Sequence, residues 1–391
     1  MRTTAARRMA MDNLRICFFF HRFDGGGAEK MTVLLANGLA RLGHEVTILI
    51  RHDKGPVRRL LEPAVQVLDM ALPERGKLRK NAGNLRWLRR VLRPGRFDVL
   101  LSVTAEMSQV AALATYGLRP RIPLISVVHS TLSQEVHSFQ RIRELLFPVF
   151  NRRYDRVIAV SDAVREDYTT LCGAPPGQAV TVYNPVIGES FWKQAETPCG
   201  HPWLVKGRDF QVIVLAGRFC AAKNHALMLE ALRLLEGHGD FRLVLLGDGE
   251  LRGELEAQAK QAGLEGKIDF AGFVPNPAAY FRETDIVALS SRFEGLPTVL
   301  IEALAVGAKV VSTDCPSGPR EILKGGAFGV LVQPGDPQAL ADGVLRALQW
   351  EPDREALRRQ ALNFTDARAA EGYLRVIRET LAQCAGREPY A

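Results

Sequence analysis

Short apolar segments alternate with longer helical patterns along almost the whole 391-residue chain. The segments are nearly all apolar, as in "RICFFF" (15–20) and "QVIVLA" (211–216), whereas the stretches between them repeat apolar residues at helical spacing. Apolar strands that are separated by helices are typical of parallel sheets with helices on both faces. The sequence therefore predicts an α/β protein built from doubly wound parallel sheets.

The strands form two series, which indicates two domains. The first series comprises 15–20, 45–51, 65–68, 98–103, 124–129, 156–160 and 180–183, and the second comprises 211–216, 242–247, 268–271, 286–290, 309–312 and 329–332. A polar, irregular segment at 184–209 separates them. We expect a disordered basic extension at 1–12, Rossmann-like domains at 13–190 and 191–365, and a helix at 366–391 that packs back on the first domain.

The composition is that of a soluble protein with a substantial core, since 47% of residues are hydrophobic and 24% are charged. No apolar run approaches the roughly 18 residues of a membrane-spanning helix, and no apolar segment of signal-peptide type follows the basic N-terminus. The six cysteines lack metal-binding spacing, which favours reduced structural thiols and a cytoplasmic protein.

The net charge of +8 is concentrated in the first half of the chain. Residues 1–193 carry 29 Lys and Arg against 17 Asp and Glu, a net +12, whereas 194–391 carry a net −4. This excess indicates an anionic partner, either a nucleic acid or a phospholipid surface, although surface charge without a function also fits.

Glycines and cations follow the first strand of each series. Gly25, Gly26 and Gly27 open a helix, where the backbone can approach a ligand and the N–H groups favour an anion, but a simple turn fits equally. Arg218 and Lys223 lie between a strand and the next helix. A guanidinium fork and a point charge at the carboxyl end of a strand suit a diphosphate, with a solvated loop as the alternative.

Two glutamates eight positions apart enclose the start of a helix in "EGLPTVLIE" (294–302). Pro297 suits the first helical position, which places Glu294 in the loop and Glu302 in the second turn. The helix start offers an anion the backbone amides of Gly295, Leu296, Thr298 and Val299. His129 ends the apolar strand "LISVVH", where a histidine can bond a substrate hydroxyl or phosphate or remain a satisfied core residue.

These segments occur in the order of a known enzyme family. The matching residues are Gly25-Gly26-Gly27-Ala28-Glu29, His129, Asn184-Pro185, Gly217-Arg218, Lys223-Asn224, Gly247-Asp248-Gly249 and Glu294 to Glu302. From about residue 13 to 385, the chain resembles family 4 of the retaining nucleotide-sugar glycosyltransferases, whose signature is E-x7-E. Their fold, GT-B, has two Rossmann-like domains that face each other across a cleft.

The resemblance implies that the C-terminal domain binds a nucleotide sugar and the N-terminal domain binds the acceptor. It assigns the catalytic roles to His129, Arg218, Lys223 and Glu294. Arg218 and Lys223 would hold the diphosphate, Glu302 the ribose, and Glu294 and His129 the donor sugar. Further donor contacts are implied for Gly25, Gly26, Gly27, Gly217, Gly247, Phe273, Val274, Gly295, Leu296, Pro297, Thr298 and Val299.

The resemblance also implies the chemistry. The departing phosphate would take the proton of the acceptor, so no side chain is assigned as nucleophile or base. We expect no metal and no other cofactor, because cations and a helix start would stabilise the leaving diphosphate. A hexose or N-acetylhexosamine donor is expected, with UDP favoured over GDP, and a saccharide or lipid-linked acceptor in bacterial cell-surface glycan synthesis.

A basic amphipathic stretch at 75–97 favours contact with an anionic membrane, at the cytoplasmic face of the inner membrane. An ordinary domain helix with its apolar side in the core also fits. Two rival functions stay open: a nucleotide-sugar epimerase or phosphorylase of the same fold, and a non-catalytic nucleic-acid-binding protein. We expect no nucleic-acid partner, because only Trp87 and Phe97 supply aromatic rings near the basic run.

Overall fold

The structure, a computed structural model, describes residues 13–24, 26–71, 77–93, 95–118, 121–134 and 147–386. The chain splits into two compact units. Unit 1 comprises 1–185 and 366–391, and unit 2 comprises 186–365. The extension expected at 1–12 lies outside the described residues.

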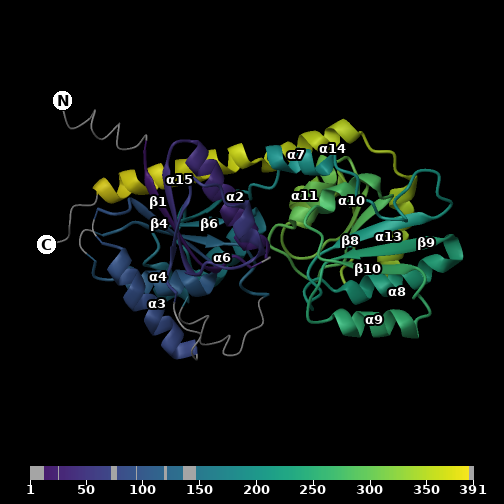
Figure 1. The fold of residues 1–391 in the computed structure, drawn as a ribbon, viewed down its shortest axis with the longest axis horizontal. Coiled ribbons are helices and arrows are strands. Elements are labelled where there is room, and N and C mark those ends of the chain that lie inside the picture. Colours follow the sequence, from purple (N-terminus) through teal and green to yellow (C-terminus); the bar gives the residue numbers. More distant parts are fainter. Residues whose placement is uncertain are drawn as a thin grey trace. The chain divides into compact units, whose positions relative to one another are not determined.

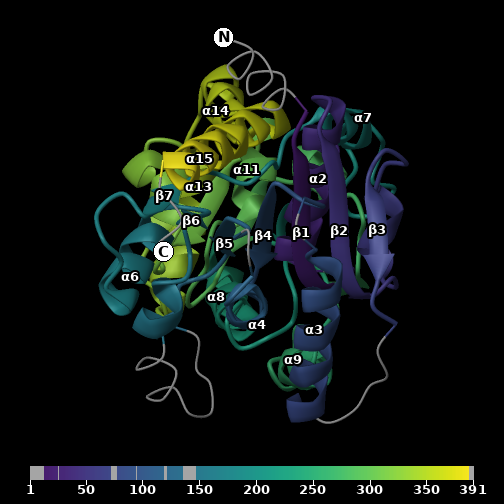
Figure 2. The same cartoon turned by 90° about the vertical axis from the view of Figure 1, so that its left-hand side faces the viewer.

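Unit 1 is built on a parallel sheet. Its strands are β1 (Arg15–Arg22), β2 (Glu45–His52), β3 (Gln66–Asp69), β4 (Val99–Val103), β5 (Leu124–Val128), β6 (Arg156–Ala159) and β7 (Ala179–Thr181). They lie in the order β3-β2-β1-β4-β5-β6-β7 (Figure 2). The strand order therefore reverses between β1 and β4, the position at which doubly wound sheets bind ligands beyond the carboxyl ends of their strands.

Helices cover both faces of this sheet (Figure 1). They are α2 (Gly27–Arg41), α3 (Lys77–Val91), α4 (Ala105–Thr115), α6 (Asp162–Cys172) and α15 (Asp366–Gly386), with a short 3-10 turn, η1 (Pro56–Leu60). Alternate strand residues such as Phe18 and Phe20 pack against Leu39 of α2 and Tyr373 of α15. Helices α3 and α4 lie on the opposite face (Figures 1 and 2).

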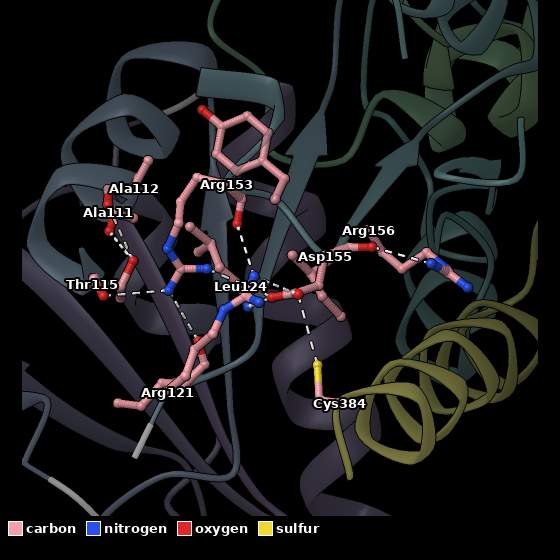
Figure 3. A network of polar contacts seen from close by, with 12 residues as sticks. Ala111, Ala112, Thr115, Arg121, Leu124, Arg153, Asp155, Arg156 and Cys384 are labelled. Atoms are coloured by element: carbon pink, nitrogen blue, oxygen red, sulfur yellow. Dashed lines mark hydrogen bonds and ion pairs between the residues drawn. The ribbon is translucent and has the colours of Figure 1, made fainter. Parts of the chain in front are cut away.

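A polar network at the amino ends of β5 and β6 binds α15 to this sheet (Figure 3). The Asp155 side chain is 4% exposed and accepts hydrogen bonds from Arg121 Nη2 at 2.6 Å and from the Leu124 N–H at 2.9 Å. Arg153 Nη1 lies 3.7 Å from the same carboxylate, and the Cys384 thiol contacts it from α15 at 3.7 Å. One buried carboxylate therefore connects two strands and the terminal helix.

Unit 2 repeats the same topology. Its strands are β8 (Gln211–Ala216), β9 (Phe241–Leu246), β10 (Ile268–Gly272), β11 (Ile286–Leu289), β12 (Val310–Thr313) and β13 (Val330–Val332), in the parallel order β10-β9-β8-β11-β12-β13. Its helices are α7 (Glu189–Ala195), α8 (His225–Leu235), α9 (Arg252–Gln261), α10 (Pro277–Glu283), α11 (Thr298–Ala305), α12 (Pro319–Ile322), α13 (Pro337–Gln349) and α14 (Arg354–Ala361). The 3-10 turns are η2 (Glu236–His238), η3 (Lys324–Gly326) and η4 (Leu362–Phe364). Here the strand order reverses between β8 and β11.

The structure confirms the α/β prediction and each predicted strand, with ends that move by one or two residues. Two local predictions were wrong. The segment 184–209 contains the helix α7, which forms because Phe191 and Ala195 are buried. Pro297 precedes its helix as the N-cap residue, since its ψ of 97° is extended, and α11 begins at Thr298. No helix among the described residues has the length and apolar character that crossing a membrane requires.

Candidate active site

Several of the predicted donor residues lie at the carboxyl ends of β8 and β11, the switch point of unit 2. The loop after β8 carries Arg218 and Lys223, and the loop after β11 carries Glu294. Because adjacent parallel strands end at the same edge of a sheet, the two loops meet there. The Arg292 N–H donates to the Ala222 carbonyl at 2.8 Å and so holds them together.

A buried ion pair joins the two loops. Lys223 Nζ lies 2.6 and 2.7 Å from the two carboxylate oxygens of Glu294. The side chain of Glu294 is 9% exposed and that of Lys223 is 25% exposed. Ser291 Oγ donates a third hydrogen bond to Glu294 at 2.6 Å. The carboxylate is therefore compensated despite its burial, and the ammonium group is held in one position at the switch point.

The backbone of the Lys223 loop is also constrained. Ser290 Oγ donates to the Lys223 carbonyl at 2.9 Å. Asn224, the N-cap residue of α8, has a left-handed φ of 48°, a conformation that asparagine adopts more readily than most residues other than glycine. The Asn224 N–H donates to the Cys220 carbonyl at 3.4 Å, so the backbone on both sides of Lys223 is held by hydrogen bonds.

The start of α11 is held by the loop that follows β12. Ser317 Oγ donates to the Gly295 carbonyl at 3.0 Å, and the Glu294 N–H donates to the Pro316 carbonyl at 3.0 Å. Gly318 has a φ of 94°, and a Cβ there would lie 2.4 Å from Pro297 Cδ. The loops are packed too closely for a side chain at this position. Pro297 makes no side-chain cap hydrogen bond to α11. The first N–H groups of a helix have no acceptor within the helix, and this helix start therefore favours an anion.

Two other predicted residues lie in contrasting surroundings. Glu302 is in the second turn of α11, as expected, and is only 4% exposed. The Arg218 side chain is 73% exposed and pairs with Glu250 at 3.2 Å, instead of joining Lys223 and Glu294. An ion pair this exposed contributes little free energy, so Arg218 can change partner at low cost.

Backbone hydrogen bonds connect the loops after β8, β9 and β10. The Gly217 N–H donates to the Leu246 carbonyl at 2.9 Å, and the Gly247 N–H donates to the Gly272 carbonyl at 2.7 Å. A Cβ at Gly247 would lie 2.0 Å from the Gly217 carbonyl oxygen, so this pair of loops requires the glycine. Phe273 and Val274 follow β10, which β9 separates from β8. Phe273 is 61% exposed, and a donor contact from this loop stays a prediction.

The remaining predicted residues belong to unit 1. His129 directly follows β5, and burial lowers its pKa to about 4, so its imidazole is neutral at pH 7. Its Nε2 atom is buried and has no hydrogen-bond partner among the described residues. Gly26 is the N-cap residue of α2 and Gly27 is its first residue, whereas Gly25 lies outside the described residues.

Sequence reasoning missed Ser291, Ser317 and Glu250. Ser291 was open to prediction, because it lies two residues after the end of an apolar strand, close to where His129 lies after β5. The contacts of Ser317 and Glu250 depend on how loops far apart in sequence meet, which no local pattern shows. Within the described part of the chain, no group of three or more His, Cys, Asp or Glu residues is placed to hold a metal ion.

Comparison with known proteins decides the family. A family profile described as Glycosyl transferases group 1 matches residues 204–364, and one described as Glycosyltransferase Family 4 matches residues 25–187. The two matches cover most of unit 2 and of unit 1. The chain belongs to glycosyltransferase family 4.

Relatives of this family 4 glycosyltransferase act in bacterial glycan synthesis. It is 26% identical over 353 residues to the N-acetylgalactosamine-N,N'-diacetylbacillosaminyl-diphospho-undecaprenol 4-alpha-N-acetylgalactosaminyltransferase of Campylobacter jejuni, covering 89% of this chain and 93% of the relative. It is also 26% identical over 378 residues to the lipopolysaccharide core biosynthesis glycosyltransferase LpsE of Rhizobium meliloti, covering 92% of this chain and 97% of that relative.

Solved structures agree on the fold. A glycosyltransferase from Rickettsia africae superposes with a TM-score of 0.75 at 17% identity, covering 94% of this chain and 99% of its own. Anabaena HepE, solved with UDP and glucose, superposes with a TM-score of 0.69 at 22% identity, covering 95% of this chain and 99% of HepE. The family 4 glycosyltransferase has the GT-B fold, with two Rossmann-like domains.

Proposed function

We propose that this glycosyltransferase moves a hexose or N-acetylhexosamine from a nucleotide-diphosphate sugar, preferably UDP-linked, to a saccharide or lipid-linked acceptor with retention of configuration. The acceptor belongs to bacterial cell-surface glycan synthesis. The Campylobacter relative, named for a lipid-linked acceptor, supports the acceptor class. The UDP and glucose bound by HepE support the choice of UDP.

One observation carries the proposal: Lys223 and Glu294 form a buried ion pair at the switch point of unit 2, beside the start of α11. Lys223 and the first amides of α11 supply positive charge for the diphosphate. Arg218 leaves Glu250 to bind the same group. Glu302 accepts hydrogen bonds from the ribose hydroxyls, and Glu294 accepts one from the donor sugar.

The reaction then needs no side-chain nucleophile. The bond between the anomeric carbon and the diphosphate oxygen breaks, and the acceptor hydroxyl oxygen bonds to the same face of that carbon. The departing phosphate oxygen takes the hydroxyl proton. Charge develops on the leaving diphosphate, where Lys223 is already held in position by Glu294. We propose that these fixed cations serve without a metal ion.

Glu302→Gln tests the ribose contact. The amide keeps the size of the side chain but replaces one acceptor oxygen with a donor. Because hydrogen bonds to a charged group are worth about 1.5–3 kcal/mol, we expect the Kd for UDP to rise by about ten- to a hundredfold. Titration calorimetry measures this change. Glu254→Gln, on the exposed part of α9, serves as the control. If the folded variant binds UDP as tightly as the wild-type protein does, Glu302 does not belong to the donor site.

We also propose that the 75–97 region binds an anionic membrane surface. Two apolar residues of this region belong to the core, because Leu88 of α3 and Leu92, which follows the helix, are fully buried. Basic residues of the same region stay exposed. Arg89 donates to the carbonyls at the end of α4, close to Leu113 and Tyr116, which are 50% and 75% exposed. A membrane contact would therefore combine the basic residues of α3 with apolar residues of α4.

Reversing three exposed charges tests the membrane contact. The variant replaces Arg86, Arg90 and Arg93 with Glu and keeps Arg89, which holds the end of α4. Each basic residue near an anionic surface contributes about 1 kcal/mol, so vesicle affinity should fall at least about a hundredfold. Co-sedimentation with phosphatidylserine-rich vesicles measures it. The control replaces Arg354, Arg358 and Arg359 of α14 with Glu. Equal pelleting of both variants contradicts the proposal.

A further inference from the structure

Buried hydroxyl groups lie behind the pair of Lys223 and Glu294, at the ends of β11 and β12. Ser291 lies two residues after β11 and is 1% exposed, and Thr313 is the last residue of β12 and is fully buried. The two strands pair in parallel. Ser291 and Thr313 therefore lie at the edge of the sheet that carries the candidate active site.

The two residues form a chain of hydrogen bonds that ends at Glu294. Thr313 Oγ1 donates to the Ser291 carbonyl at 2.7 Å, and Ser291 Oγ donates to Glu294 Oε1 at 2.6 Å. The Arg292 N–H, in the same peptide group as the Ser291 carbonyl, donates to the Ala222 carbonyl at 2.8 Å. This peptide group is thus held at both of its polar atoms, which fixes the position from which Ser291 holds the carboxylate.

The contacts of Glu294 leave its two carboxylate oxygens unequal. Within the described part of the chain, Oε1 accepts hydrogen bonds from Lys223 Nζ and Ser291 Oγ, whereas Oε2 accepts one from Lys223 Nζ alone. A carboxylate oxygen can accept about two hydrogen bonds. Oε1 is therefore filled, and one acceptor position remains on Oε2.

We propose that Ser291 and Thr313 are positioning residues, which orient Glu294 so that Oε2 accepts a hydrogen bond from a single hydroxyl of the donor sugar. This inference rests on the proposed function, in which Glu294 binds that sugar. Neither positioning residue contacts the donor, because both are buried and donate their protons within the fold. They act by holding the carboxylate in place before the donor binds, so that no orientation is needed during the reaction.

Removal of each hydroxyl group in the full-length protein tests the two roles. Ser291→Ala removes the donor to Glu294, and Thr313→Val removes the donor to the Ser291 carbonyl while it keeps the shape of the side chain. Thr313→Ser retains the hydroxyl group and is the conservative rescue. Thr284→Val is the matched control, because Thr284 Oγ1 also donates to a strand carbonyl, that of Val212 at 2.7 Å, but precedes β11.

Two measurements separate positioning from folding. Sugar transfer to a bacterial lipid extract is measured with UDP-glucose, UDP-galactose and their N-acetyl derivatives, and the Kd for UDP is measured by calorimetry. We expect Ser291→Ala and Thr313→Val to lower kcat/KM at least about tenfold, because a hydrogen bond to a charged group, or its support, is lost. Thr313→Ser and Thr284→Val should stay near the wild-type value. The Kd for UDP should be unchanged in all four variants, because UDP lacks the sugar that Glu294 binds.

Three results would overturn the inference. The first is a Ser291→Ala variant that transfers sugar as fast as the wild-type protein does. The second is a parallel loss of transfer and UDP binding, since this would show a structural role only. The third is an equal loss in Thr313→Val and Thr313→Ser, since the hydroxyl group would then not matter. A wild-type protein that transfers none of the four sugars would instead contradict the proposed function, and the inference with it.

Deoxygenated donors test the single contact on Oε2. The preferred donor is prepared without one sugar hydroxyl at a time, and each analogue is measured with the wild-type protein and with Glu294→Gln. For one analogue only, Glu294→Gln should lower kcat/KM less than it does with the complete donor, because that analogue already lacks the hydroxyl that Oε2 accepts. The absence of such an analogue, or the finding of several, would contradict the assignment of one hydroxyl to Glu294.

Discussion

The Lys223→Ala variant is expected to lose about 10²- to 10³-fold in kcat/KM, the usual effect of removing one preorganised charge that stabilises a transition state. Lys223 is held by both oxygens of Glu294, so its charge needs no reorganisation when the diphosphate leaves. Arg218→Ala should cost less, because its side chain is 73% exposed and must first leave Glu250. The activity of both variants is measured as the release of nucleoside diphosphate in the presence of acceptor.

A double-mutant cycle makes this prediction sharper. Lys223 and Glu294 are in direct contact, so the losses of Lys223→Ala and Glu294→Gln should not add in the double variant. Lys260→Ala, an exposed lysine on α9, gives the background effect of losing a positive charge in unit 2. Two results would contradict a role of this pair in the reaction. One is a decrease in kcat/KM for Lys223→Ala that is no larger than for Lys260→Ala, and the other is fully additive effects of the two substitutions in the cycle.

Asp155→Asn is expected to lower the free energy of unfolding of unit 1 by about 3–5 kcal/mol, the usual result of removing one partner of a buried ion pair. The Asp155 carboxylate is 4% exposed. It accepts hydrogen bonds from Arg121 and from the Leu124 N–H, and it forms an ion pair with Arg153 (Figure 3). Without its charge, the Arg153 guanidinium, which is 14% exposed, is left poorly compensated.

Urea denaturation followed by tryptophan fluorescence measures the change. Asp162→Asn is the matched control, since its carboxylate is 55% exposed and also pairs with an arginine. UDP affinity should be the same in both variants, because Asp155 and Asp162 belong to unit 1. An Asp155→Asn loss as small as that of the control would mean that solvent, rather than the carboxylate, compensates Arg153.

The strands were predictable because burial on both faces leaves a strong local pattern. β1 and β8 are continuous apolar segments in the sequence, and the structure places both in the interior of their sheets, with a strand on either side. Predictions failed where packing overrides local preference. The sequence of α7 shows no helical pattern, but the helix forms because Phe191 is buried there. The extended ψ of Pro297 moves the start of α11 by one residue.

Sequence reasoning selected the residues of the candidate site by their type, but it did not predict the contacts between them. Lys223 and Glu294 are 71 positions apart, and the spacing of the two glutamates gave no indication that the lysine would bind one of them. The order of β8 and β11 in the sheet creates that contact. The partner of Arg218 was missed for the same reason, because Glu250 reaches it from the loop after β9.

The most direct test of the account is the fate of a UDP-linked sugar incubated with the wild-type protein and a bacterial lipid extract. The account predicts that UDP is released only when the extract is present, that the sugar appears in the lipid fraction with its anomeric configuration retained, and that Lys223→Ala nearly abolishes both. A donor converted to another nucleotide sugar without the extract would show an epimerase, and transfer unaffected by Lys223→Ala would contradict the proposed site.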